Sequence, residues 1–144
     1  DAYTTMRWLS TSCHTADGSQ FSVPVDGVIL AGDSAGGNIA LVLSLLLLHG
    51  VDADQHPDAE GHRMFGMLRC NALLYPMLFE LNTPSNMLKV VRYFLPRGML
   101  LLFYKHSYLG EDHERLKELL LDWRVAPLRA PGLQGLPNTI VVSC

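Results

Sequence analysis

A short glycine-rich segment of this chain has the residue types and the spacing for nucleophilic catalysis. Residues 32–36 read Gly-Asp-Ser-Ala-Gly and fit the pattern G-x-S-x-G. A serine in this pattern stands at a sharp, strained turn between a strand and a helix, which exposes its hydroxyl to a substrate carbonyl. We therefore predict that Ser34 is the nucleophile of an acyl-transfer reaction.

The neighbours of Ser34 are predicted to support it. Ser34 lies at the start of a helix, where backbone N–H groups lack intrahelical acceptors, so the Ala35 N–H is a candidate donor to an oxyanion. The other neighbours are assigned structural roles in the turn: Gly32, Asp33, Gly36 and Gly37. We expect Gly32 and Gly36 to let the strand and the helix approach closely because they lack Cβ atoms. The alternative is a turn in which Ser34 only caps the helix.

Hydrophobic patterns predict the elements that position Ser34. The β-branched run at 25–31 is typical of a buried parallel strand, and the Leu-rich run at 38–49, followed by Gly50, predicts a buried helix. Further elements are predicted at 67–75 and 139–142, as strands, and at 3–10, as a helix. Strands that alternate with helices indicate an α/β fold with a parallel sheet.

Two connecting regions complete the predicted organisation. The stretch 49–63 is polar, contains Pro57 and Gly61, and is predicted to be a surface loop. The segment between the second and third strands is apolar with helical spacing, which predicts a helical insertion. Packing in a core would by itself also explain why its side chains are apolar. Three strands leave long unpaired sheet edges, so we expect that flanking strands are missing.

Composition excludes several classes of protein. The chain has 144 residues, of which 49% are hydrophobic and 17% charged, as in one globular domain. A net charge of −3 offers no basic surface for nucleic acid. The three cysteines, Cys13, Cys70 and Cys144, lack CxxC spacing, so neither a metal site nor a disulfide scaffold is predicted and their redox state stays open.

The sequence shows no segment that would hold the chain in a membrane. Its longest apolar run, 39–48, is shorter than the about 18 to 20 residues that span a bilayer. The N-terminus has no basic region followed by an apolar one, as a signal peptide would. Because the chain also begins without Met, we expect it to be an internal piece of a longer protein.

The longer string at 32–38, Gly-Asp-Ser-Ala-Gly-Gly-Asn, resembles the nucleophile elbow of the hormone-sensitive-lipase-like α/β hydrolases. Other segments follow in the family's order: Leu74-Tyr75-Pro76, Ala126-Pro127-Leu128 and Gly135-Leu136-Pro137. The stretches 121–128 and 141–144 are similar to the arylacetamide deacetylase branch. The resemblance implies a single partial α/β-hydrolase domain over 1–144, with a helical cap-like insertion at about 84–125 that covers the site.

This chain departs from the family pattern at the partners of Ser34. Family members carry a His-Gly-Gly run upstream that completes the oxyanion hole, whereas here the one upstream histidine is His14, followed by Thr15. The family's acid and histidine follow the strand that corresponds to 139–142, beyond the last residue here. No other histidine is assigned a catalytic role: His49, His56 and His62 are expected at the opposite end of the sheet, and His106 and His113 on the surface of the insertion.

The resemblance implies a carboxylic ester hydrolase that needs no cofactor and acts on small lipophilic esters or arylacetamide-like amides. For the deacetylase branch it implies an enzyme of the endoplasmic reticulum membrane, held by an anchor that these residues lack. The 144 residues alone are expected to be inactive because they lack the base and most of the oxyanion hole. Two alternatives stay open, an inactive truncated product and a serine peptidase or thioesterase on the same fold.

Overall fold

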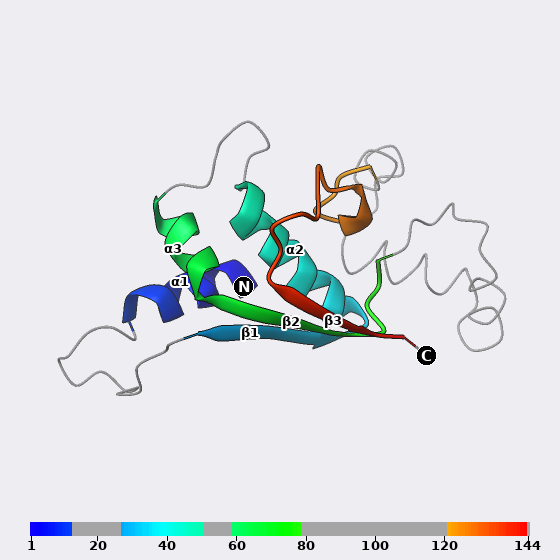
Figure 1. Ribbon diagram of the computed structural model, residues 1–144, viewed down its shortest axis with the longest axis horizontal. Coiled ribbons are helices and arrows are strands. Elements are labelled where there is room, and N and C mark those ends of the chain that lie inside the picture. Colours follow the sequence, from blue (N-terminus) through cyan, green and yellow to red (C-terminus); the bar gives the residue numbers. More distant parts are fainter. Residues whose placement is uncertain (13–26, 51–58, 79–120, 144) are drawn as a thin grey trace, which may run out of the picture. The chain divides into compact units, whose positions relative to one another are not determined.

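The computed structural model describes residues 1–12, 27–50, 59–78 and 121–143. The chain divides into two compact units, one formed by Asp1–Leu78 with Ala130–Cys144 and the other by Phe79–Arg129. The first unit contains the sheet and Ser34 (Figure 1). The predicted insertion at about 84–125 lies outside the described residues except for 121–125, which form turns, and so it stays a prediction.

Three parallel strands form the sheet, in the order β1-β2-β3. Their bounds are Val28–Asp33 for β1, Leu68–Leu74 for β2 and Asn138–Val142 for β3. The register places Asp33, Leu74 and Val142 side by side, so all three strands end at the same edge. This confirms the predicted α/β class, because parallel neighbours require crossover connections between them.

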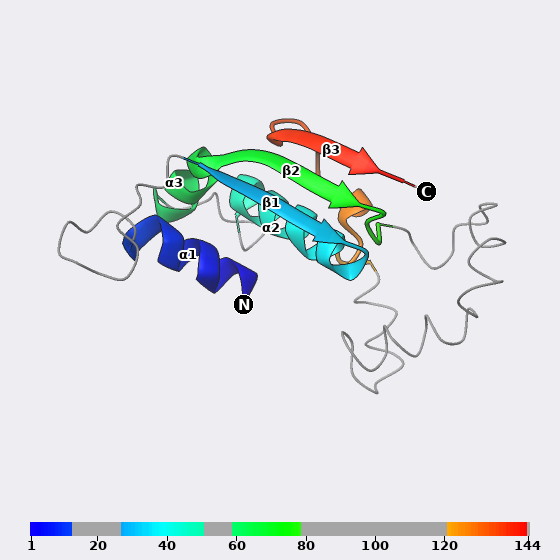
Figure 2. The ribbon, with the colours of Figure 1, turned by 90° about the horizontal axis from the view of Figure 1, so that it is seen from below.

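Three helices lie on one face of the sheet (Figures 1 and 2). They are α1 (Ala2–Ser12), α2 (Ala35–His49) and α3 (Ala59–Met67). α2 runs along the middle of the sheet and contacts both β1 and β2. Four of its leucines are buried, and each fully buried leucine stabilises the fold by about 1.5–3 kcal/mol: Leu41, Leu43, Leu45 and Leu47.

The core of this unit lies between the helices and the sheet. One cluster of buried apolar side chains joins all three helices to β2: Met6, Leu43, Leu47, Met64, Met67 and Leu68. The methionines of α3, Met64 and Met67, belong to this cluster, and α3 lies in contact with α2. The sequence-predicted buried helix is therefore confirmed as the centre of the core.

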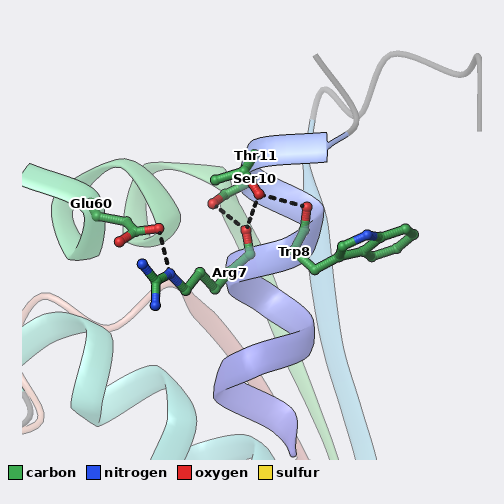
Figure 3. A network of polar contacts seen from close by, with 5 residues as sticks. All are labelled: Arg7, Trp8, Ser10, Thr11 and Glu60. Carbon is green, nitrogen blue, oxygen red and sulfur yellow. Dashed lines mark hydrogen bonds and ion pairs between the residues drawn. The ribbon is translucent and has the colours of Figure 1, made fainter. Parts of the chain in front are cut away.

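α1 is joined to α3 at the surface by one ion pair (Figure 3). Arg7 Nε donates to Glu60 Oε1 at 3.0 Å. The hydroxyls of Ser10 and Thr11 donate back to the carbonyl oxygen of Arg7, at 2.8 and 3.0 Å. An exposed pair of this kind contributes about 0.2–1 kcal/mol, so the buried Met6 does more than Arg7 to hold α1 in place.

The structure corrects the predicted surface loop at 49–63. Its second part forms the start of α3, where Gly61 is buried on the same face as Met64 and Met67. The prediction was wrong because it read Gly61 as a loop residue, whereas the residues that follow it have helical spacing. The helix also extends to Met67, so β2 begins at Leu68 rather than at 67.

A buried asparagine links β2 to α2 and to β3. Asn71 Nδ2 donates to the hydroxyls of Ser44 on α2 and Thr139 on β3, both at 3.2 Å. Thr139 in turn donates to the carbonyl oxygen of Pro137 at 2.9 Å. Since a buried amide without partners would cost free energy, these bonds favour the observed register of β2 and β3.

The other face of the sheet is apolar and exposed. Ile29 on β1 is 62% exposed and Ile140 on β3 is 59% exposed, and both side chains point away from α2. Within the described ranges, no helix covers this face (Figure 2). β1 and β3 are the outer strands of the sheet as described.

Candidate active site

The chain turns sharply at Ser34, between the last residue of β1 and the first residue of α2. Ser34 has φ 49° and ψ −115°, a conformation that residues with a side chain rarely adopt. In the described part of the chain, the Ser34 side chain makes no hydrogen bond that caps α2. The alternative in which Ser34 only caps the helix therefore lacks the contact that it requires.

Two glycines allow the backbone to fold back tightly at this turn. A Cβ atom on Gly32 would collide with the carbonyl group of Gly36. A Cβ atom on Gly37 would lie 2.8 Å from Pro76 Cβ and 3.1 Å from the Gly32 carbonyl oxygen. The predicted close approach thus depends on Gly32 and Gly37, since a Cβ on Gly36 would meet its nearest neighbour, Asp33 Oδ1, only at 3.9 Å.

Residues at the end of β2 and just after it make hydrogen bonds with the turn. The Ser34 N–H donates to the carbonyl oxygen of Leu74 at 3.0 Å, and the Met77 N–H donates to the carbonyl oxygen of Ser34 at 3.0 Å. Tyr75, between them, has a positive φ of 36°. Its hydroxyl donates to Asp33 Oδ2 at 3.3 Å.

The start of α2 faces the edge of the sheet where the strands end. Ala35 is the first helical residue, so its N–H has no acceptor within the helix. The α2 dipole places its positive end at the same point, in a helix of 15 residues. A negatively charged oxygen beside Ser34 would be stabilised by both features.

The described histidines lie far from Ser34. His49 is the last residue of α2, so a rise of about 1.5 Å per residue puts it about 21 Å from Ala35. Its Nε2 lies 2.8 Å from the carbonyl oxygen of Gly132. His62 is on α3, which leads into the opposite end of β2. The remaining candidates, His56, His106 and His113, lie outside the described residues.

Neither metal binding nor membrane spanning finds support in the described residues. The described ranges contain no group of three or more His, Cys, Asp or Glu side chains that could hold a metal ion. In the same part of the chain, no helix combines the length and the apolar character needed to cross a bilayer. Cys70, on β2, is a free thiol, and its Sγ donates to the carbonyl oxygen of Asn71 at 3.4 Å.

A parallel sheet with a strained serine between a strand and a buried helix defines a class of α/β proteins in which this serine lies at the carboxyl edge of the sheet. A family model of the alpha/beta hydrolase fold matches residues 1–144, and the chain belongs to this family, in its hormone-sensitive-lipase-like group. Membership indicates hydrolase activity. No curated protein and no solved structure matches the chain.

Sequence reasoning missed the contribution of residues 74–77 to the turn. The sequence predicts a strand that ends at 75 and shows Leu74-Tyr75-Pro76 in the family's order, but neither observation predicts a contact with Ser34. In the structure, Leu74 accepts from Ser34, Met77 donates to Ser34, and Pro76 packs against Gly37. The only local signal was Pro76, which cannot donate to a sheet ladder and therefore ends the strand at this point. Its partner could not be found without the register of β1 and β2.

Proposed function

We propose that Ser34 is the nucleophile of a serine carboxylic ester hydrolase. The observation that supports this function most is the conformation of Ser34, which is strained and whose hydroxyl caps nothing among the described residues. Strain of about 1–3 kcal/mol persists only where the surrounding structure imposes it, and such sites concentrate where chemistry occurs. A serine needed only for folding would adopt the cheaper capping geometry.

In this reaction Ser34 Oγ bonds to the carbonyl carbon of an ester while its proton passes to a general base. The Ala35 N–H donates to the oxyanion that forms. The alcohol then leaves with a proton, and water hydrolyses the acyl group from Ser34. The described histidines, His49 and His62, lie at the other end of the sheet from Ser34. The family resemblance places the base and its carboxylate partner after the strand at 139–142, so we propose that both come from sequence outside residues 1–144.

The proposed substrates are small, uncharged lipophilic esters or arylacetamide-like amides. The resemblance of 121–128 and 141–144 to the arylacetamide deacetylase branch supports this class. The net charge of −3 argues against nucleic acid as a partner.

The test compares two forms of the protein, the 144-residue chain and the same chain within its complete open reading frame. Each form is made as wild type, Ser34→Ala and Ser143→Ala, the last as a matched serine control. We measure hydrolysis of p-nitrophenyl butyrate and labelling by a fluorophosphonate, with the labelled residue located by mass spectrometry. The complete protein should lose activity only in Ser34→Ala, and the 144-residue chain should be inactive in all three variants.

Other outcomes separate the alternatives. Activity in the complete Ser34→Ala protein would contradict the assignment of the nucleophile. A complete protein that neither hydrolyses esters nor reacts with the fluorophosphonate would support the inactive product. Faster cleavage of peptides or thioesters than of acyl esters would replace the esterase by one of those activities.

A further inference from the structure

We infer that Asn38 is a positioning residue for Ser34, acting through the chain segment that follows β2. This role rests on the proposed function of Ser34 as the nucleophile. Asn38 lies one helical turn after Ser34 and is only 3% exposed. Its side chain points away from solvent, so its contacts are internal.

Hydrogen bonds connect Asn38, Met77 and Ser34 in a closed ring. Asn38 Nδ2 donates to the carbonyl oxygen of Met77 at 2.7 Å. The Met77 N–H donates to the carbonyl oxygen of Ser34 at 3.0 Å, and the Asn38 N–H donates to that same oxygen at 3.2 Å. The Ser34 carbonyl oxygen therefore accepts two hydrogen bonds, and the Asn38 side chain holds Met77, which is one of the two donors.

This ring acts on the part of Ser34 that is strained. The carbonyl of Ser34 defines its ψ of −115°, so the two bonds to that oxygen hold the peptide plane in its unusual orientation. The bond from the Ser34 N–H to Leu74 fixes the other side of the residue. Without the Asn38 amide, the Met77 carbonyl would lose its hydrogen bond to Asn38 Nδ2. The orientation of Ser34 Oγ and of the Ala35 N–H would then become less defined.

Close packing provides a second link between the same segments. Gly37 contacts Pro76 so tightly that a Cβ atom would lie 2.8 Å from Pro76 Cβ. This contact packs the segment after β2 against α2, but it does not fix the orientation of the Met77 carbonyl. The short hydrogen bond from Asn38 fixes that orientation, because a hydrogen bond weakens when donor and acceptor are misaligned.

The first experiment measures amide hydrogen exchange in the 144-residue chain and needs no activity. It compares Asn38→Ala with Asn71→Ala, a matched control that removes another buried asparagine, whose amide bonds Ser44 and Thr139. The exchange rate of the Met77 amide should rise at least about tenfold in Asn38→Ala relative to the amides in the middle of α2. Equal rises in both variants would overturn the role of Asn38.

A second variant covers the case in which Asn38→Ala does not fold. Asn38→Asp has nearly the same shape, but its ionised carboxylate cannot donate to Met77, whereas the protonated acid can. Protection of the Met77 amide in Asn38→Asp should therefore recover as the pH is lowered, after correction with Asn71→Asp. Protection that does not depend on the protonation of Asp would contradict the proposed hydrogen bond.

The third measurement uses the complete protein and its ester hydrolysis. Asn38→Ala should lower kcat by about tenfold to a hundredfold, as expected for a misplaced nucleophile, and leave KM within about twofold. A loss confined to KM, or an unchanged kcat, would contradict a positioning role. If Ser34→Ala proves fully active, the proposed function fails, and the exchange data still decide whether Asn38 orders the turn.

Discussion

Gly37 on α2 lies against Pro76, the second residue after β2, with no room for a side chain between them. The two residues are far apart in sequence and meet because β1 and β2 are parallel neighbours that end at the same edge. Their contact joins the start of α2 to the segment that also bonds Ser34 and Asn38. The segment after β2 thus contacts both the turn at Ser34 and the start of α2.

The first prediction concerns this contact. Gly37→Ala would place Cβ 2.8 Å from Pro76 Cβ and 3.1 Å from Pro76 Cα, so either α2 or the segment after β2 must move. We expect the free energy of unfolding to fall by about 1–3 kcal/mol, as for other overpacked sites. Urea denaturation measures this change.

The matched control is Gly66→Ala on α3. A Cβ at Gly66 would meet nothing within 4 Å among the described residues, and Gly66 is exposed. Alanine should therefore stabilise the chain by about 0.5–1 kcal/mol through its higher helix propensity. Equal effects of the two substitutions would show that the contact between Gly37 and Pro76 does not restrict residue 37.

The second prediction concerns the strain at Ser34. Ser34→Gly should raise the free energy of unfolding by about 1 kcal/mol, because glycine adopts a positive φ without steric cost. Ser34→Ala should change it by less than about 0.5 kcal/mol, since the hydroxyl caps nothing in the described structure. Thermal and urea unfolding of the three proteins check the order, and a glycine variant less stable than the alanine variant would contradict the strain.

The third prediction concerns the core on α2. Leu47 is 1% exposed and belongs to the cluster that joins the three helices, so Leu47→Ala should cost about 2–5 kcal/mol. Ile39 lies on the same helix but is 42% exposed, and Ile39→Ala should cost much less, within about 1 kcal/mol. The difference between their midpoints in urea measures how firmly α2 is anchored.

The fourth prediction concerns the pH dependence of the turn at Asp122. Hydrogen bonds from Arg124 hold the pKa of the Asp122 carboxyl below its ordinary value, against the opposing effect of partial burial. Since the folded pKa is lowered, this stabilisation is complete above the unfolded pKa of about 3.9 and is lost as the pH falls through the folded value.

NMR titration of the Asp122 carboxyl carbon measures this effect. Arg124→Gln should return the pKa toward its ordinary value, because the guanidinium donors and the charge are both lost. Arg124→Lys should return it only in part, since lysine keeps the charge but lacks the planar pair of donors. An unchanged pKa in Arg124→Gln would show that Arg124 does not cause the shift.

The sequence by itself determined the elements around Ser34. The β-branched run before Gly32 and the leucines after Gly37 predict a strand and a buried helix, and both are present. The helix begins at Ala35, before the predicted start at 38, because Gly36 and Gly37 have low helix propensity and tertiary packing overrides it. The strand at β1 also runs on to Asp33, since its last residues pair with β2.

Only the tertiary structure decided what surrounds Ser34. The partners of the Ser34 backbone, Leu74 and Met77, are about forty residues away in sequence, so their roles depend on the parallel register of β1 and β2. The same register brings Pro76 onto Gly37 and the carbonyl of Met77 onto Asn38. Local patterns place a serine at a turn, whereas the contacts that hold it there arise when distant strands end at one edge.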